Sequence, residues 1–538
     1  MPLPDRARFQ EYALKGVHLA LRRGGQAPEQ RAARRLAAQA RPVAADGPRV
    51  AFLSPRDWAA HVHWEAMIGH ALQQRGAQVA FLTCGGGLEI CDRANTWEAP
   101  PMPCRSCTRY VEDSIDAHGF DRVPLRPGWE ADEDDGWPEL DAVALGGLAA
   151  VSGDDGAPLG ALTEIPVKWF LMRTDLENEP LAAPTWRSFL RSARRIERGV
   201  EAALDRLQPD VVMLLNGLFL FEAVAWEVCR RRGIDVVTYE RGMIKETLVV
   251  ERNSPACLFD LRAPWAARRA QPLTEDEEAR LDGYLDDRRH GRRTIDRFWG
   301  DARFDDAAAT AGGRLVTLFT NLTWDSAVIG RERAFTSIQE WLATSVALVA
   351  ERPQDTLVIR IHPAELKLPG KQTREPMLAV IEAQVGTLPP NVRVVEPTDP
   401  QSSYPLMEAS DLGLVYTSTT GLELALRGVP TVVAGETHYR DKGFTLDVDD
   451  PEDFRATVTA ALDDPAAHAP DADLARRYAH LFFFEAPVGS PGVEEHVQGL
   501  VRLTTNRLAD LAPGVDPDVD RICDVILDGD HAATSSAA

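Results

Sequence analysis

One pattern dominates the second half of the chain, in which short apolar runs rich in Val, Ile and Leu alternate with stretches of helical periodicity. Five of these runs are predicted as strands, at residues 314–319, 356–361, 392–395, 411–416 and 430–434. Helical patterns separate most of them, and strands that are joined through helices lie parallel to one another. Because a parallel sheet needs helices on both faces, this half of the chain is predicted to form a doubly wound α/β domain.

The first half carries the same alternation with longer interruptions. Strands are predicted at residues 49–54, 78–83, 210–216 and 234–242, and helices at residues 58–75, 186–206 and 219–232. Residues 120–160 are acidic and rich in Gly and Pro, so we interpret them as an irregular insertion. The chain is therefore predicted to belong to the α/β class and to contain two doubly wound domains.

Breaks in composition set the expected domain limits. We expect a basic helical arm at residues 1–46, an N-terminal domain at 47–310, a C-terminal domain at 311–485, and C-terminal helices with a disordered tail at 486–538. The Ala-Gly-Gly break at 311–313 separates the two large domains. Residues 452–510 have helical patterns and could pack back on the first domain.

Charge restricts the partners of this chain. Its 538 residues carry a net charge of -23, which argues against nucleic-acid binding, because a phosphate backbone needs a dense cationic surface. Residues 1–41 are the exception, with nine Lys/Arg against three Asp/Glu. This arm could contact a membrane surface or an acidic protein, or remain a solvated helix.

Hydropathy indicates the expected compartment. The chain contains no uninterrupted apolar run of about 18 residues, the length that would suggest a membrane span. Its first residues also lack the apolar core of a secretory signal. We therefore expect a cytoplasmic protein, which would be peripheral at the inner face of the membrane if the arm binds there.

Polar residues follow the predicted strands of the second domain. They form the segments TNLTWD (320–325), His362 with Pro363, EPTDPQSS (396–403) and TSTTG (417–421). In open parallel sheets, ligands bind beyond the carboxyl ends of the strands. We therefore expect these segments to line one ligand site.

Two of these segments suit an anionic ligand. Ser418, Thr419 and Thr420 supply hydroxyl groups at a helix start, where unpaired N–H groups favour negative charge, and Gly421 leaves room for a ligand. The same hydroxyls could instead serve only as helix caps. The proline after His362 keeps that residue extended, so its ring could donate to a departing phosphate. A lone histidine is more often a structural residue.

Charged residues downstream extend this candidate site. Glu423 could accept hydrogen bonds from ribose hydroxyls, or could simply be a favourable charge near a helix N-terminus. Arg440 and Lys442 lie in GETHYRDKGFT (435–445), after another predicted strand, where they could neutralise a diphosphate or an acidic sugar. A surface loop of mixed charge is the competing interpretation.

Four of the seven cysteines cluster in the first domain. Cys84, Cys91, Cys104 and Cys107 are separated by six, twelve and two residues. Only the last spacing is usual for a zinc site, and it follows the stiff segment PPMP. The four residues could bind a structural zinc, remain as unligated reduced thiols, or take part in redox chemistry.

Several segments together resemble one protein family. FTNLTWD (319–325), IRIHPAE (359–365) and the long stretch at 416–445 are similar to the C-terminal half of bacterial capsule polysaccharide biosynthesis proteins, and LLNG and VVTYERG to their first domain. That group includes Kdo-transferase-like glycosyltransferases of the GT-B type. The resemblance spans residues 49–480. It implies two facing Rossmann-like domains, a nucleotide-sugar donor on the C-terminal one, a saccharide or glycoconjugate acceptor on the N-terminal one, and no obligatory metal cofactor.

The resemblance and the strand-end residues define the predicted site. The donor is expected to contact Asn321, Arg360, His362, Ser418, Thr419, Thr420, Gly421, Glu423, Arg440 and Lys442. Of these, His362 and the turn at 418–420 match the donor-phosphate motifs of the family. Catalysis also needs a base for the acceptor hydroxyl. Asp57 is our first candidate for this base, and Glu240 with Arg241 would close the site.

The predicted function is glycosyl transfer in the synthesis of surface or capsular polysaccharide. Fold alone does not establish it, because similar paired domains also carry out epimerisation and polyol-phosphate transfer. A catalytically silent scaffold that binds partners through the arm and the cysteine loop is a further alternative. No phosphate loop of the G-K-[ST] type and no G-x-G-x-x-G fingerprint supports a kinase or a dehydrogenase.

Overall fold

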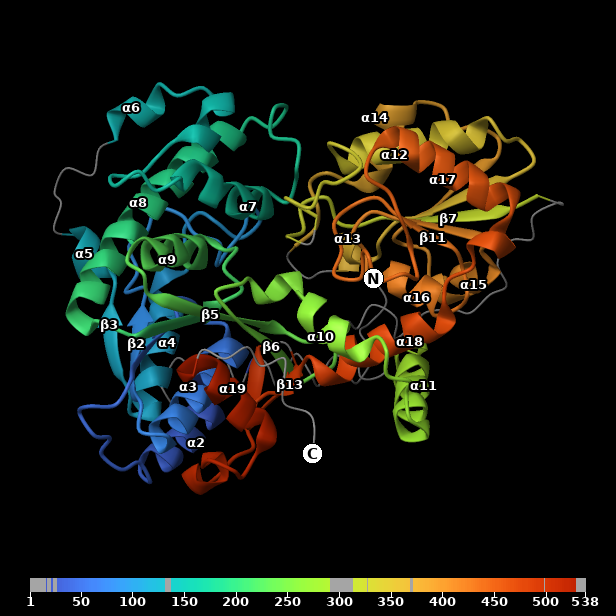
Figure 1. Cartoon of the computed structure of the whole chain (residues 1–538). Coiled ribbons are helices and arrows are strands. Elements are labelled where there is room, and N and C mark those ends of the chain that lie inside the picture. The colour runs from blue at the N-terminus through green and yellow to red at the C-terminus, as the bar shows by residue number, and fades with distance from the viewer. Residues whose placement is uncertain are drawn as a thin grey trace.

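Two α/β domains lie side by side in the computed structural model (Figure 1). The structure describes residues 16, 21–22, 27–130, 137–290, 313–326, 328–367, 371–497 and 499–528. Half of the predicted basic arm, and the tail beyond residue 528, lie outside these residues. Within the part of the chain that is described, no helix is long and apolar enough to cross a membrane.

The N-terminal domain is built on a seven-stranded sheet with the order β13-β6-β5-β4-β1-β2-β3. The strands are β1 (Arg49–Leu53), β2 (Gln78–Thr83), β3 (Asp121–Pro124), β4 (Val211–Leu215), β5 (Asp235–Arg241), β6 (Thr247–Arg252) and β13 (Val488–Gly489). The first five are parallel, and β6 and β13 complete one edge in antiparallel pairings. The strand order reverses between β1 and β4, which are neighbours in the sheet.

The C-terminal domain has a six-stranded parallel sheet with the order β12-β11-β10-β7-β8-β9. Its strands are β7 (Leu315–Phe319), β8 (Thr356–Arg360), β9 (Val392–Val395), β10 (Leu412–Val415), β11 (Thr431–Val433) and β12 (Leu446–Asp447). The chain leaves β7 towards β8 on one side and later returns through β10 on the other. The order of this sheet therefore reverses between β7 and β10.

Helices cover both sheets. In the first domain they are α2 (Pro28–Ala37), α3 (Ala59–Gln74), α4 (Cys104–His118), α5 (Arg126–Glu130), α6 (Pro138–Asp141), α7 (Leu159–Leu171), α8 (Ala182–Leu207), α9 (Leu220–Arg231) and, from the end of the chain, α19 (Pro517–Leu527). With the second domain lie α10 (Arg262–Arg268), α11 (Glu275–Arg289), α12 (Ile338–Ala350), α13 (Ala364–Lys367), α14 (Met377–Val385), α15 (Ser403–Ala409), α16 (Thr420–Ala425), α17 (Pro451–Asp463) and α18 (Ala472–His480).

Burial of both sheet faces explains the continuous apolar strands. In β1, Val50 and Phe52 pack into the core on one face of the sheet, while Ala51 and Leu53 pack into the core on the other. Side chains of a strand alternate between the faces, so a strand covered on both sides needs apolar residues at every position. The nine predicted strands are all confirmed, and so is the predicted fold class.

Three segments differ from the sequence prediction. The acidic segment at 120–160 contains β3, which pairs with β2 at the sheet edge, so the segment is not wholly irregular. Residues 262–289, expected in the first domain, form α10 and α11, and these pack into the core of the second domain. The segment after 485 is not only helical, because it contains β13 and the hairpin of β14 (Val493–Val497) and β15 (Leu500–Leu503) before α19.

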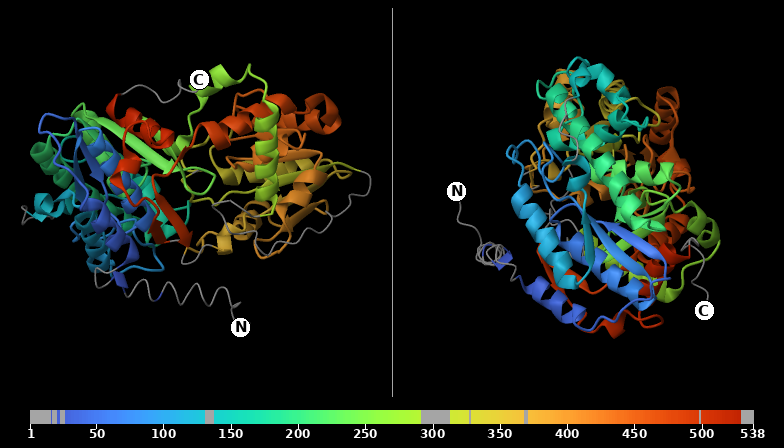
Figure 2. Two further views of the ribbon diagram at one scale, coloured as in Figure 1. Left: turned by 90° about the horizontal axis from the view of Figure 1, so that it is seen from below. Right: turned by 90° about the vertical axis from the view of Figure 1, so that its left-hand side faces the viewer.

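The end of the chain returns to the first domain. The hairpin and α19 contribute to the same apolar core as α2, α3 and α4. Figure 2 shows this C-terminal segment (red) against the N-terminal helices (blue). The chain therefore crosses between the domains both at α10 and after α18.

Candidate functional site

The topological reversal of the C-terminal sheet brings two predicted segments together. Asn321 follows β7 and Thr417 follows β10, and these strands are neighbours. The Thr417 N–H donates to Oδ1 of Asn321 at 3.4 Å. Loops that leave neighbouring strands in opposite directions open a ligand-binding position between them. We call this position, from Asn321 to Thr420, the C-terminal switch point.

His362 lies beside the C-terminal switch point at the end of β8. Its backbone N–H donates to Oγ1 of Thr320 at 3.1 Å, and its Nδ1 accepts from the Ala364 N–H at 3.1 Å. Burial and the nearby Arg360 charge lower the pKa of His362 to about 4. The ring is therefore neutral at pH 7, and with Nδ1 as an acceptor its proton lies on Nε2.

The predicted hydroxyl turn forms, but its capping pattern differs from expectation. The Ser418 hydroxyl donates to Oγ1 of Thr420 at 2.9 Å and accepts from the Thr420 N–H at 3.2 Å. Thr419 occupies the N-cap position of α16 without a side-chain cap, and α16 has only six residues. The half-buried hydroxyls, rather than the dipole of a long helix, are what this turn can offer a ligand.

Position 421 requires glycine for a different reason from the one predicted. A Cβ at this position would overlap the hydroxyl of Tyr439 and lie 3.0 Å from Val415 Cγ2. The Tyr439 hydroxyl donates to the carbonyl oxygen of Ser418. The space beside Gly421 is therefore occupied by Tyr439 and not by a ligand. The Tyr439 hydroxyl stabilises the turn through its hydrogen bond to Ser418.

The other predicted donor contacts are engaged within the protein. Arg360 donates to the carbonyl oxygens of Glu396 at 2.6 Å and Gln401 at 3.1 Å. Arg440 donates to the carbonyl of Val448 at 2.8 Å, and Lys442 to the carbonyl of Arg440 at 3.0 Å. All three cationic side chains are buried. These contacts favour a role in holding the loops rather than in binding a diphosphate.

Glu423 is also paired. Its Oε1 accepts from Arg288 of α11 at 2.7 Å, and Glu423 is buried while Arg288 is partly buried. Burial alone would raise the pKa of Glu423, but Arg288 and Arg427 hold it below its ordinary value. This ion pair fastens α11 to the C-terminal domain, a role that the sequence did not predict.

The N-terminal sheet has its own switch point between β1 and β4. Asp57 follows β1 and forms an ion pair with Arg93, whose Nη2 lies 3.2 Å from Asp57 Oδ2. Asn216 follows β4, and its Nδ2 donates to Oε2 of Glu240 at 2.8 Å. Asp57 is thus engaged with a cation, whereas Glu240 has a neutral partner.

Glu240 is the carboxyl at this switch point whose surroundings raise its pKa. It is half-buried at the end of β5, and its Oε1 accepts from the Arg241 N–H at 2.8 Å. Burial raises the pKa of Glu240, and the negative charge of Asp325 adds to this effect. Because Asp325 belongs to the loop after β7, the carboxyl end of β5 in one domain approaches that loop of the other.

A buried polar network lies behind Glu240. The Tyr239 hydroxyl donates to Oε1 of Glu65 at 2.6 Å and lies 3.1 Å from Nδ1 of His61. Burial raises the pKa of Glu65 to about 8, so this carboxyl is largely protonated at neutral pH. Burial lowers the pKa of His61 well below its ordinary value. Glu65 and His61 are therefore both uncharged near pH 7.

Further contacts join the two domains around these residues. Arg331 Nη2 lies 3.5 Å from the Cys257 carbonyl oxygen, while its own carbonyl accepts from the Glu436 N–H at 2.9 Å, next to β11. The rings of Trp169 and Trp324 lie 6.5 Å apart, and Lys371 Nζ lies 4.1 Å from the Trp169 ring centre. We call this region the domain junction.

Sequence reasoning missed Arg331 and Lys371. Burial lowers the pKa of Lys371 to about 8, and burial also lowers the pKa of Arg331. Both residues belong to segments without regular periodicity, so no pattern placed them beside the first domain. Their only sequence signal is a cation within a loop that follows a predicted strand.

The four clustered cysteines line one small pocket beside Arg56 and Phe221, but no three of their sulfur atoms lie within 4.8 Å of one another. Among the described residues, one group brings three potential ligand atoms within 4.8 Å of one another, and it is Glu277, His480 and Glu485. Arg268 already donates to both of those carboxylates. Its guanidinium supplies the positive charge there, so that group is a salt-bridge network.

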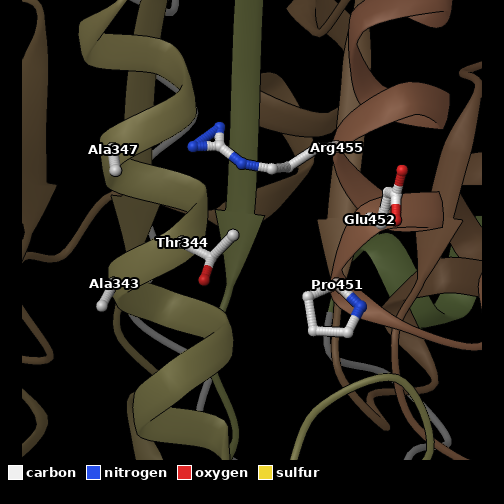
Figure 3. Close-up of a pocket in the computed structure, with 6 residues that line it drawn as sticks. All are labelled: Ala343, Thr344, Ala347, Pro451, Glu452 and Arg455. Atoms are coloured by element: carbon white, nitrogen blue, oxygen red, sulfur yellow. The ribbon is translucent and has the colours of Figure 1, made fainter.

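A surface hollow of about 500 Å³ lies between α12 and α17 (Figure 3). Ala343, Thr344 and Ala347 line one side, and Pro451, Glu452 and Arg455 line the other. None of these is a candidate site residue. The hollow therefore does not bear on the two switch points.

Comparison with known proteins gives distant structural likenesses only. No family model matches the chain, and neither does any curated protein. Among solved structures, the KpsC beta Kdo 2,7 transferase of Thermosulfurimonas dismutans is 14% identical, with a TM-score of 0.33 over 58% of this chain and 88% of that one. The calicheamicin glycosyltransferase CalG4 is 14% identical, with a TM-score of 0.27 over 83% and 96%.

An epimerase is also among these likenesses. The UDP-GlcNAc 2-epimerase of Neisseria meningitidis, bound to UDP-GlcNAc, is 12% identical, with a TM-score of 0.25 over 82% of this chain and 99% of that one. Likenesses at these TM-scores carry no argument about activity. The assignment of two Rossmann-like domains depends instead on the strand order of the two sheets.

Proposed function

We propose that this protein is a GT-B-type glycosyltransferase that moves a sugar from a nucleotide-sugar donor to a saccharide or glycoconjugate acceptor, in surface or capsular polysaccharide synthesis. The proposal depends on one observation. Glu240, a carboxyl of raised pKa at the end of β5 in the first domain, lies close enough to Asp325 of the second domain for their charges to interact. Asp325 belongs to the loop after β7, at the C-terminal switch point. Sugar transfer needs this pairing of an acceptor base with a donor site.

On the donor side, the C-terminal switch point would hold the phosphates. The Thr420 hydroxyl, which accepts from Ser418 and keeps its own proton, and the Nε2–H of His362 would supply neutral hydrogen-bond donors. Arg331 is one cation of this domain that reaches the junction, and Lys371 is another. Neutral donors and one guanidinium can stabilise the charge that develops on a departing phosphate oxygen.

On the acceptor side, Glu240 would take the proton of the attacking hydroxyl. The bond between the donor sugar carbon and the phosphate oxygen breaks, a glycosidic bond forms, and the nucleotide leaves with its phosphate. Asn216 keeps the Glu240 carboxyl in place through its 2.8 Å hydrogen bond. Asp57, our first candidate for the base, is less suited to this role because Arg93 already neutralises it.

The test is product analysis with a panel of UDP-, GDP-, CMP- and CDP-sugars and mixed oligosaccharide acceptors. A thermal-shift screen of the same panel first selects the donor, because a ligand that binds only the folded state raises its stability. Nucleotide release is then measured by chromatography, and the sugar product by mass spectrometry. We expect release that depends on acceptor and falls about 10²- to 10⁴-fold in Glu240→Gln, the usual contribution of a general base.

Glu139→Gln is the matched control, because Glu139 is an exposed glutamate of the same domain. It should leave the rate unchanged. Rearranged nucleotide-sugar formed without acceptor would instead identify an epimerase, and phosphorus retained in the acceptor product would identify a phosphotransferase. Full transfer activity in Glu240→Gln would remove Glu240 as the base.

A further inference from the structure

A short segment of the C-terminal domain, residues 371–375, lies against the N-terminal domain. We call it the junction strap. It comes between α13 and α14 in the sequence, and its backbone contacts the end of α7. Figure 1 shows the two domains meeting near α7, away from the place where the chain crosses at α10 and after α18. The domains are therefore held together at a second place, without a covalent connection.

Backbone groups set the position of the strap on the first domain. The Arg374 N–H donates to the carbonyl oxygen of Met172 at 3.0 Å, and the Thr373 hydroxyl lies 3.3 Å from the same oxygen. Met172 ends α7 with a φ of 54°, in the left-handed region that residues other than glycine rarely adopt. The Trp97 indole N–H donates to the carbonyl oxygen of Gln372 at 2.9 Å. Two separate parts of the first domain thus bind the strap.

Glu375 joins a loop of the C-terminal switch point to the first domain. Its Oε2 accepts from the Thr174 N–H at 2.9 Å and from the Thr323 hydroxyl at 2.9 Å. Thr174 follows α7 of the N-terminal domain, whereas Thr323 belongs to the loop after β7, two residues beyond Asn321. A single carboxylate oxygen therefore bridges the two domains.

An ion pair adds to this contact. Arg374 Nη2 lies 2.9 Å from Oε2 of Glu179, and Arg173 Nη1 lies 3.1 Å from the same oxygen. The Glu179 side chain is only 2% exposed. Two guanidinium groups from different domains thus share one buried carboxylate. Removal of one partner from a buried pair is costly, because the remaining charge is less well compensated.

Apolar side chains from both domains pack together beside the strap. Met172 of the first domain lies in one buried cluster with Leu322, Trp324 and Ala364 of the second. Leu322 and Trp324 belong to the loop after β7, and Ala364 begins α13, which follows β8. The Trp324 indole N–H also donates to the Thr373 hydroxyl oxygen at 3.0 Å. The contact between the domains therefore involves both loops that carry residues of the C-terminal switch point.

We propose that the junction strap holds the two switch points in a fixed relative orientation, with Glu375 as its positioning residue. Loss of Glu375 would leave each half of the site folded but would no longer align the halves. The consequence for catalysis rests on the proposed glycosyl transfer, in which the acceptor hydroxyl must lie within reach of the donor sugar. Misplacement by about 1 Å can lower such a rate about 10²-fold.

The partners of Glu375 allow a conservative substitution. Both are neutral donors, one a backbone N–H and the other a hydroxyl. The side-chain oxygen of glutamine can accept both hydrogen bonds, so Glu375→Gln should keep the contact between the domains. Glu375→Ala removes the acceptor and should break it.

Hydrogen–deuterium exchange of the full-length protein, followed by mass spectrometry, tests the contact without any substrate. Peptides that contain Thr174 should exchange about 10- to 100-fold faster in Glu375→Ala, the effect expected for losing hydrogen bonds to a charged group, and at the wild-type rate in Glu375→Gln. Glu382→Ala is the matched control, because Glu382 is an exposed glutamate on α14 of the same domain. Equal exchange at Thr174 in wild type and Glu375→Ala would overturn the proposal.

Activity measurements then separate positioning from a general loss of structure. Acceptor-dependent transfer should fall about 10²-fold in Glu375→Ala and recover in Glu375→Gln, while nucleotide affinity stays at the wild-type value. Unchanged transfer, or an equal loss of transfer and nucleotide affinity, would overturn the positioning role. A wild type that exchanges as expected but transfers no sugar would contradict the proposed function and leave the contact established.

A second variant covers the case in which Glu375→Ala does not fold. Arg374→Met removes the ion pair with Glu179 and leaves Glu375 in place. It should also speed exchange in peptides that contain Thr174 and lower transfer without lowering nucleotide affinity. Arg393→Met is its matched control, since Arg393 is an exposed arginine of β9 in the same domain. Exchange at the wild-type rate in Arg374→Met would count against the strap.

Discussion

Replacement of Glu65 by glutamine should make the protein more stable, by an amount that grows with pH. Glu65 is only 2% exposed, and burial raises its pKa from 4.5 to about 8. The folded state therefore binds a proton that the unfolded state has released over this range. A carboxyl with a raised pKa contributes stability that is fully present below about pH 4.5 and is lost as the pH rises through about 8.

The size of the effect follows from the pKa difference. Each pKa unit corresponds to about 1.4 kcal/mol, so full ionisation of Glu65 costs the folded state about 5 kcal/mol. About 3 kcal/mol of this cost is already present near pH 7. Glutamine keeps an oxygen that can accept the hydrogen bond donated by Tyr239 at 2.6 Å, but it cannot ionise. The free energy of unfolding of Glu65→Gln, relative to wild type, should thus rise by about 4 kcal/mol between about pH 5 and about pH 9.

The assay is unfolding by heat and by urea at several pH values across that interval. Glu139→Gln is the control, because substitution of this exposed residue should have the same small effect at every pH. A stability difference between wild type and Glu65→Gln that stays constant within about 1 kcal/mol over the interval would refute the reasoning, since about 4 kcal/mol is expected. It would mean that Glu65 ionises in the folded protein as easily as in the unfolded chain.

Two further substitutions test contacts of the C-terminal domain. Gly421→Ala should lower the free energy of unfolding by about 1–3 kcal/mol, because its Cβ meets the Tyr439 hydroxyl, and Tyr439→Phe in the same chain should recover part of this loss in thermal unfolding. Strictly additive effects would contradict that contact. Arg288→Met should cost about 3–5 kcal/mol by leaving Glu423 buried without its ion-pair partner, and addition of Glu423→Gln should restore much of it. A melting temperature unchanged by Arg288→Met would contradict the pair.

The sequence predicted the two sheets because both of their faces are covered. In β1 and β10 every residue on the buried faces is apolar or glycine, so the runs stand out from the polar segments around them. β3 lacked such a signal, since it lies at a sheet edge with only Val123 buried. β13 is two residues long and pairs with β6, which lies more than two hundred positions earlier in the sequence.

Packing between segments that are far apart in the sequence could not be predicted either. α11 is strongly charged and buries only Leu281 and Tyr284, so its pattern gave no indication of which domain it joins. Arg288 on the same helix contacts Glu423 from 135 residues away. Such pairings depend on the course of the whole chain rather than on local periodicity.

For the candidate site, the positions of the residues could be predicted better than their roles. His362, Asn321 and the turn at 418–420 follow neighbouring strands, and parallel topology brings strand ends together. The residue type alone did not reveal that Arg360 and Arg440 are buried against backbone carbonyls. A cation after a strand can bind a ligand or a loop, and only its surroundings decide which.

Calorimetric titration of a nucleotide onto the C-terminal switch point tests the central claim most directly. The nucleoside mono- and diphosphates of the donor panel are titrated into wild type, Asn321→Ala, Ser418→Ala and the exposed-hydroxyl control Thr459→Ala. At least one nucleotide should bind the wild type, and Asn321→Ala and Ser418→Ala should each weaken it by about 1–3 kcal/mol, or about 5- to 150-fold, the loss expected for a hydrogen bond to a charged group. Thr459→Ala should bind normally. Affinity left intact by both switch-point substitutions, or no nucleotide binding at all, would contradict the account.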